Sequence, residues 1–320
     1  MKRPAAPLVT LAALLALAWA GPAALAQTPP PSPPGLAATS DVGAHDPTLI
    51  EQGGVMHVFT TGRGLQHLRS DDGGRHWQRL APVFQQAPAW WAEAVPAHRD
   101  LDVWAPKVFE HRGRYWLLYS ISTFGKKRSA IGLASSPALQ GQPWRDEGLV
   151  VASGEADDFN AIDPDLLRDD DGRLWMAYGS WWGGLRVTEL SPETLRPVGE
   201  TRFIARRRGG LEAPTLVRRG PWVYLFASFD HCCKGKDSTY NIRVGRAASV
   251  QGPYLDQEGR DMMEGGGTVL ERAGGRWIGP GHQDVVGRWL IRHAYDAEDG
   301  GKPKLRLDEL RWREDGWPQL

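Results

Sequence analysis

The amino-acid sequence predicts an all-β protein, and three observations support this prediction. One pattern occurs five times: a polar or proline-containing motif, two or three apolar residues, a turn, and a strongly apolar run of β type. Glycine-containing turns, such as Gly53-Gly54 and Asp171-Gly172, stand where hairpins need positive φ. No segment keeps a 3.6-residue apolar period long enough for a core helix. Five such repeats predict a five-bladed β-propeller.

Each motif is expected to begin the innermost strand of one blade. The motifs start about 50 to 70 residues apart, which suits the four antiparallel strands and the loops of a blade. Innermost strands start beside a central channel, so equivalent motif residues should converge there. The motifs and the apolar runs after them are His45–Leu49 with Val55–Thr60, Trp104–Val108 with Tyr115–Ser120, Asp163–Leu166 with Leu174–Ser180, Glu212–Leu216 with Trp222–Phe229, and Gly281–Val285 with Trp289–Tyr295.

Residues 1–26 are predicted to be a secretory signal peptide. A basic start precedes an apolar run from Leu8 to Trp19, and small residues at Ala24 and Ala26 resemble a cleavage site. The run is shorter than the roughly 20 apolar residues that a membrane helix needs. We therefore expect a soluble protein without a membrane span, secreted or periplasmic after removal of the signal peptide.

Residues 27–39 are predicted to form a proline-rich linker, because five prolines between Gln27 and Gly35 favour an extended, solvated chain. No second linker divides the remaining residues. Propellers often run this long as one domain, so residues 40–320 are expected to form a single propeller domain. We expect this domain to be a monomer.

Charge and composition point to a neutral partner. Lysine plus arginine and aspartate plus glutamate each number 38, and no basic tract suggests nucleic-acid binding. The chain has 15 tryptophans and 8 phenylalanines. Indole rings can stack on sugar rings, although filling a β core explains most of them.

The only cysteines, Cys232 and Cys233, are adjacent, which excludes a disulfide framework. Ordinary disulfide geometry does not suit neighbours, so a bond between them would be uncommon, and we assign neither thiol a catalytic role. A turn motif of many propellers, S-x-D-x-G-x-x-W, occurs at Ser70–Trp77. We expect Asp72 to bind turn amides and Trp77 to pack between blades.

Three motifs place a carboxylate at the predicted channel: Asp46, Asp163 and Glu212. Acidic residues form strands poorly and are costly to bury, so their position before apolar strands requires an explanation. One Asp-Pro alone would indicate a turn, but three carboxylates in one repeat frame indicate a shared site. Glycoside hydrolysis needs one protonated carboxylic acid and one carboxylate, and a third carboxylate can raise the pKa of the acid.

The chain also resembles glycoside hydrolase family 43, in particular its endo-1,5-α-L-arabinanases, from about Ala44 to Arg306. The most specific stretch is Phe159–Asp165, followed by Gly179–Gly184. The remaining similarity lies at His45-Asp46-Pro47, Tyr115–Gly125, Leu211–Pro214, Phe229–Gly235, which includes the paired cysteines, and Gly279–His282.

This resemblance implies inverting hydrolysis of α-1,5-linked L-arabinan, including the arabinan side chains of pectin. Asp46 would be the general base, Glu212 the general acid, and Asp163 the group that tunes and orients Glu212. Inversion requires about 6.5–9.5 Å between base and acid. The residues expected to bind arabinose are His45, Phe124, Gly125, Asn160, Ala161, Ile162, Ser180, Trp181 and Trp182.

Two further residues are interpreted through the family. The resemblance implies a channel calcium near His282, with water completing the shell, although calcium prefers oxygen ligands. Lys107 is a departure, because relatives often have aspartate there. If it faces the channel, its charge is expected to lower the pKa of Glu212 or alter a subsite.

Three alternatives exist. The first stays open, and the residues disfavour the other two. An exo-acting α-L-arabinofuranosidase or β-xylosidase would share the fold and motifs, since loop shape decides between groove and pocket. A non-catalytic carbohydrate-binding propeller would not need three intact carboxylates. A sialidase would need an arginine cluster and a tyrosine nucleophile, and the sequence shows no matching set.

Overall fold

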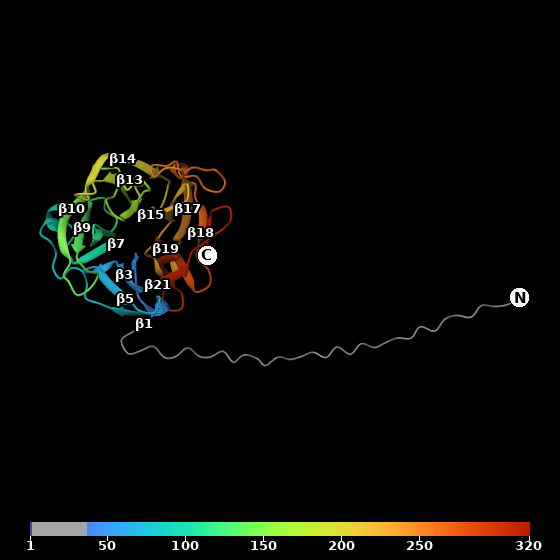
Figure 1. Cartoon of the computed structure of the whole chain (residues 1–320), viewed down its shortest axis with the longest axis horizontal. Helices are drawn as coiled ribbons and strands as arrows, with labels where there is room; N and C mark the ends of the chain where they lie inside the picture. The colour runs from blue at the N-terminus through green and yellow to red at the C-terminus, as the bar shows by residue number, and fades with distance from the viewer. Residues whose placement is uncertain (2–36) are drawn as a thin grey trace. The chain divides into compact units, whose positions relative to one another are not determined.

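The computed structural model describes Met1 and residues 37–320. Residues 37–320 contain a ring of five β-sheets, so the predicted all-β propeller is confirmed (Figure 1). The predicted signal peptide and residues 27–36 of the predicted linker lie outside the described residues. The end of that linker belongs to the propeller, because strand β1 (Ala37–Ala38) pairs with β6 (His76–Arg79). No helix among the described residues is long and apolar enough to cross a membrane.

The five blades follow one another along the chain, and their predicted inner hairpins all form. In the first two blades, the strands from the channel outward are β2 (Thr48–Gln52), β3 (Val55–Thr60), β5 (Gln66–Ser70) and β6, and then β7 (Asp102–His111), β8 (Arg114–Ile121), β9 (Ser129–Ser136) and β10 (Arg145–Ser153). A two-residue strand, β4 (Gly62–Arg63), extends the second sheet beside β7.

The third and fourth blades have four strands each, and the fifth sheet has three. These strands are β11 (Asp165–Arg168), β12 (Leu174–Tyr178), β13 (Leu185–Leu190) and β14 (Pro197–Ala205); β15 (Leu211–Arg219), β16 (Trp222–Phe229), β17 (Asn241–Ala247) and β18 (Thr268–Glu271); and β19 (Trp277–Val286), β20 (Trp289–Asp296) and β21 (Lys302–Glu309).

Short elements connect and cover the blades. The only α-helix among the described residues has five residues, which agrees with the lack of helical periodicity. These elements are α1 (Trp90–Ala94), the 3-10 helices η1 (Thr39–Asp41), η2 (Gly235–Asp237) and η3 (Met262–Glu264), and the C-terminal pair β22 (Arg311–Trp312) and β23 (Pro318–Gln319).

The N-terminal segment closes the ring by adding to the fifth sheet. The Ala44 N–H donates to the Pro303 carbonyl, and the Leu305 N–H donates to the Val42 carbonyl. Gly43 forms an antiparallel bridge with Lys304 of β21. Residues 42–44 thus cover the outer edge of the last blade, and an unpaired edge strand is avoided there.

Five apolar clusters form the core, and each lies between two neighbouring blades or their flanking segments. Trp77 is buried in the cluster between the first and fifth blades, together with Ile291 and Leu305. Asp72 accepts hydrogen bonds from the Arg75 and His76 amides. Both structural roles predicted for the Ser70–Trp77 turn are therefore confirmed.

A repeated backbone feature marks the channel end of every inner strand. At this end of each inner strand, one residue has φ between 45° and 58°, a region that residues other than glycine rarely adopt. The ladder between inner and second strands is irregular at these sites in the second, fourth and fifth blades. The five residues are Asp46, Ala105, Asp163, Ala213 and His282.

Candidate active site

A cavity of about 660 Å³ lies where the inner strands begin, and all five blades contribute to its wall. Its size is typical of a small-molecule or oligosaccharide site. The three predicted carboxylates line it together. The predicted residues in its wall are His45, Asp46, Phe124, Gly125, Asn160, Ile162, Asp163, Ser180, Trp181, Trp182, Glu212 and His282.

One predicted contact residue is not in the wall. Ala161 is fully buried, and its amide donates to the Ser153 hydroxyl, with 2.9 Å between nitrogen and oxygen. Its neighbours Asn160 and Ile162 are both in the cavity wall. The prediction that Ala161 contacts sugar therefore does not agree with its burial.

Histidines and a threonine surround Asp46. Its Oδ1 lies 2.7 Å from His45 Nδ1 and 3.1 Å from His282 Nδ1, and Thr61 donates to Oδ2 at 2.5 Å. Its backbone amide donates to Nδ1 of His293, which is fully buried. Burial alone would raise the pKa of Asp46, but the positive charge of His282 and the hydrogen bonds of His282 and His45 hold it well below its usual range. Asp46 is therefore an ionised carboxylate in a fixed orientation.

His282 supplies the positive charge at the centre of this cluster. Burial alone would lower the pKa of His282, but Asp46, Asp163 and Glu212 raise it to about 9. Its backbone amide donates to the Ser228 hydroxyl at 2.8 Å, which fixes the backbone of β19 where that strand reaches the channel. The imidazolium thus compensates negative charge in this cluster, above all that of Asp46.

Asp163 is buried and lies beside the fourth inner strand. Burial raises its pKa, as do Glu212 and Asp46, and together they bring it to about 8 in spite of His282. Its Oδ2 accepts a hydrogen bond from the Ala213 amide at 3.1 Å, one residue after Glu212. Asp163 therefore favours its protonated form more than an ordinary aspartate does, and it orients the backbone next to Glu212.

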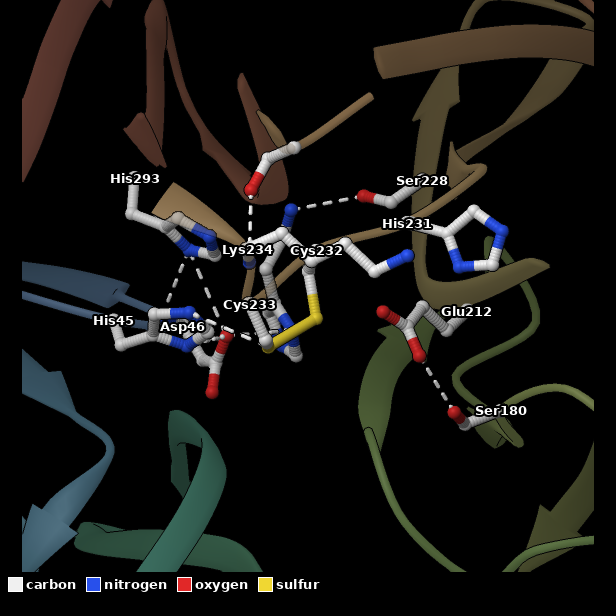
Figure 2. Close-up of a disulfide and its surroundings, with 12 residues drawn as sticks. His45, Asp46, Ser180, Glu212, Ser228, His231, Cys232, Cys233, Lys234 and His293 are labelled. Atoms are coloured by element: carbon white, nitrogen blue, oxygen red, sulfur yellow. Dashed lines mark hydrogen bonds and ion pairs between the residues drawn. A yellow bond between two sulfur atoms is a disulfide. The ribbon is translucent and has the colours of Figure 1, made fainter. Parts of the chain in front are cut away.

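Glu212 lies across the cavity from Asp46 in Figure 2 and is about nine-tenths buried. Ser180 donates to its Oε2 at 2.7 Å. No hydrogen bond from residues 37–320 reaches its Oε1. The carboxyl group is thus oriented through one oxygen, and the other is free for a ligand.

Exposed aromatic rings form part of the wall. Phe124 is 76% exposed and Trp182 is 53% exposed, both unusual for rings of this size. Trp181 packs beside His231, with 5.0 Å between ring centroids. Such rings offer flat apolar faces beside the carboxylates.

Residues 39–318 of the chain match the model of glycosyl hydrolases family 43. The chain belongs to glycosyl hydrolase family 43. Its similarity to an extracellular endo-α-(1→5)-L-arabinanase of Bacillus subtilis is 46% identity over 282 residues, which covers 86% of each protein. An extracellular exo-α-(1→5)-L-arabinofuranosidase of Cellvibrio japonicus is 39% identical and covers 87% of this chain and 86% of the relative.

A solved structure gives the same family 43 assignment. The endo-arabinanase from Bacillus licheniformis aligns with a TM-score of 0.86 and 46% identity, over 88% of this chain and 99% of that one. An exo-1,5-α-L-arabinanase from a bovine ruminal metagenomic library aligns with a TM-score of 0.85 and 37% identity, over 88% and 98%. The chain is therefore a glycoside hydrolase of a fold shared by endo- and exo-acting enzymes.

Several wall residues of this family 43 site were missed by sequence reasoning. Trp104 could have been found, because it occupies the same position in its motif as Glu212 occupies in the fourth. The others lie in loops that carry no repeat signal. The missed residues are Thr61, Trp104, Ser122, Thr123, Lys126, His231, Cys232, Cys233 and Lys234.

Cys232 and Cys233 form a disulfide, although a bond between adjacent cysteines is uncommon. Figure 2 shows this bond in the cavity, beside His45 and Asp46 on one side and facing Glu212 on the other. Cys233 Sγ lies 3.9 Å from His45 Nε2. The two residues therefore belong to the wall of the site.

Lys107 lies two residues beyond the channel end of its strand and is not in the cavity wall. Its ammonium group lies 2.7 Å from a carboxylate oxygen of Asp165 and 2.7 Å from one of Asp284. Both acidic residues occupy the equivalent position in other blades. The positive charge of Lys107 is thus paired with two carboxylates beneath the cavity. Neither expected effect, a lower pKa of Glu212 or an altered subsite, agrees with this position.

The residues near His282 do not fit calcium as direct ligands. Among the described residues, one group with suitably close donor atoms is His45, Asp46 and His293, all within 4.8 Å of one another. Two of its three donors are nitrogens, whereas calcium takes six to eight oxygens. His282 Nδ1 is already engaged by Asp46.

Proposed function

We propose that this protein is an inverting endo-1,5-α-L-arabinanase that cleaves arabinan, including the arabinan side chains of pectin. The observation that carries the proposal is the meeting of Asp46, Asp163 and Glu212 in one cavity with aromatic walls. The endo-acting relatives of Bacillus subtilis and Bacillus licheniformis, at 46% identity, support the substrate and the mode.

Asp46 is the proposed general base. It is ionised, and Thr61 and the histidines hold it in one orientation from which it can accept a proton from water. Its low pKa means that water must be well aligned, because a weakly basic carboxylate removes a proton slowly unless bond formation proceeds in the same step.

Glu212 is the proposed general acid, because its free Oε1 can face the glycosidic oxygen while Ser180 holds Oε2. Asp163 is proposed to assist it. Two nearby carboxyls ionise together only at a high cost, and Asp163 also fixes the Ala213 amide beside Glu212. Proton donation and water activation then occur on opposite sides of the sugar, which inverts its configuration.

Exo action is the second candidate function, and the comparisons with relatives support it. Relatives named for exo action align over as much of this chain as those named for endo action. Exo-acting β-xylosidase activity is the other form of this alternative. A purely sugar-binding role is disfavoured, because it would not require three buried carboxylates.

A time course on linear, debranched arabinan tests the proposal. Endo action produces a mixture of oligosaccharides early in the reaction, whereas arabinose or one short product from the start indicates exo action. NMR of the first-formed anomer tests the stereochemistry. Inversion of an α-linkage gives the β-anomer first, and retention would overturn the assignment of Asp46 as a base.

We further propose that the protein acts outside the cytoplasm as a monomer. The basic and apolar start of the sequence supports export, and relatives from Bacillus subtilis and Cellvibrio japonicus are named extracellular. Export is tested by N-terminal sequencing of protein recovered from the medium. The oligomeric state is tested by light scattering, for which the expected mass is that of one chain.

A further inference from the structure

Three polar groups connect the disulfide to the proposed base. The Cys233 amide donates to the Tyr295 hydroxyl oxygen at 2.7 Å, and this oxygen lies 3.0 Å from His45 Nε2. His45 Nδ1 lies 2.7 Å from Asp46 Oδ1. The fourth blade is thereby linked through the fifth to the first, across the side of the cavity that holds the base.

Proton positions along this chain follow from hydrogen-bond chemistry. The backbone amide of Cys233 can only donate, so the Tyr295 oxygen accepts there and keeps its own proton for another partner. A carboxylate oxygen can only accept, and His45 Nδ1 lies 2.7 Å from Asp46 Oδ1, so the proton between them lies on Nδ1. In a neutral imidazole the other nitrogen is then an acceptor, and Tyr295 donates to it.

The disulfide explains why the Cys233 amide has a fixed direction in an exposed loop. Cys233 is exposed and has φ of 65°, a conformation that non-glycine residues rarely adopt. The bond to Cys232 joins neighbouring side chains and restricts the backbone between them. The following amide, that of Lys234, is also fixed, because it donates to the Ser238 hydroxyl at 3.0 Å.

His45 is held on its other faces as well. Its ring stacks on His293, with 3.8 Å between centroids and 23° between planes. Stacking sets the plane of the ring but does not choose which nitrogen carries the proton. The groups at the ring edge make that choice: Asp46 at Nδ1, and Tyr295 at Nε2, with Cys233 Sγ farther away at 3.9 Å.

We propose that Tyr295 and the Cys232–Cys233 disulfide are positioning groups for Asp46. They select the His45 tautomer that donates to Asp46, and they hold that imidazole in place during water activation. The kinetic consequence rests on the proposed function, whereas the tautomer of His45 does not.

The first test is Tyr295→Phe, which keeps the ring and removes the hydroxyl. The matched control is Tyr254→Phe, because Tyr254 is also buried and its hydroxyl makes one hydrogen bond, to the Val250 carbonyl. Imidazole ¹⁵N NMR, with His45 assigned through a His45→Asn variant, is expected to show Nδ1 protonated and Nε2 accepting. Tyr295→Phe should move the Nε2 resonance, and Tyr254→Phe should not.

Kinetics on linear arabinan provide the second readout. A displaced catalytic group lowers kcat by up to about a hundredfold, so Tyr295→Phe should lower kcat while KM changes less than about twofold. A Cys232→Ser/Cys233→Ser double variant should lower kcat in the same direction. Combined with Tyr295→Phe it should cause no further loss, because both changes interrupt one chain.

Three results would overturn the inference. One is a wild-type His45 with its proton on Nε2 and none on Nδ1. Another is full additivity of the cysteine and tyrosine variants. The third is a cysteine variant that raises KM alone, which would make the disulfide a substrate contact. If the wild-type protein does not cleave arabinan, the proposed function fails, and the NMR arm still decides the role of Tyr295.

Discussion

Lys107 and Asp284 form a buried ion pair one layer beneath the proposed catalytic carboxylates, with 2.7 Å between Nζ and Oδ1. Asp284 also accepts hydrogen bonds from the Thr48 hydroxyl and the Leu49 amide. Asp165, the second partner of Lys107, accepts from the Leu216 amide. Side chains from four inner strands and a backbone amide of the fifth thus share one polar network along the channel.

Lys107→Met should destabilise the propeller strongly. The change leaves Asp165 and Asp284 as buried charges without their cation, and breaking a buried pair in this way costs about 3–5 kcal/mol. The measurement is the free energy of unfolding from urea titration. Adding Asp165→Asn and Asp284→Asn should recover part of the loss.

Lys302→Met is the matched control for that experiment, because Lys302 pairs with Asp299 at the surface. Exposed pairs contribute little, so its unfolding midpoint should stay close to that of the wild type. Equal midpoints for Lys107→Met and Lys302→Met would contradict a structural role for the buried network.

Glu212→Ala should abolish most hydrolysis and keep substrate binding. Removing a proton donor lowers kcat by about 10²- to 10⁴-fold when the leaving group needs protonation. Calorimetric titration with arabino-oligosaccharides should show affinity close to that of the wild type. A nitrophenyl arabinofuranoside, whose leaving group needs little protonation, should lose much less rate. Undiminished arabinan hydrolysis would show that another group is the acid.

The buried pair His57 and His67 should make the protein sensitive to moderate acid. Their rings are hydrogen-bonded at 2.9 Å, and burial, with the positive charge of a neighbour, lowers the pKa to about 4 for His57 and about 3 for His67. Unfolded histidine titrates near pH 6.5, so below that value the unfolded chain binds protons that the native chain does not. The free energy of unfolding should therefore fall from about pH 6.5 to about pH 3, and be fully retained above pH 6.5.

A His57→Asn/His67→Asn variant tests the source of this acid sensitivity. Its free energy of unfolding should depend less on pH between 7 and 4 than that of the wild type. Replacement of the exposed His231 by Asn should leave the pH dependence unchanged. The same slope in all three proteins would assign acid sensitivity to other groups.

Chelation should have little effect on activity. The donors around Asp46 include two imidazole nitrogens and few oxygens, which calcium binds poorly. We expect EDTA-treated protein to retain its rate on arabinan, with no gain from added calcium. Loss of activity that calcium alone restores would show a site built largely from water, as the family resemblance implied.

Much of this molecule could be predicted from local sequence. Hairpin turns, apolar runs and repeat spacing depend on residues close together in the chain, so the five blades were predictable. The carboxylates were predictable for a related reason, since equivalent positions of a repeat converge on one axis. The alignment of the repeats was wrong by one residue in the fourth blade. There Ala213, and not Glu212, has the positive φ that Asp46 and Asp163 share.

Contacts between side chains of different blades could not be predicted from local sequence. The link from Cys233 through Tyr295 to His45 joins residues 62 and 250 positions apart, and the Lys107–Asp284 pair spans 177. Their partners are decided by closure of the ring, which brings inner strands and loops together independently of their order. The sequence by itself thus determined the blades and the chemical groups at their inner ends. Only the tertiary structure decided which charge and which proton each group meets, because hydrogen bonds and ion pairs act over a few ångströms in space.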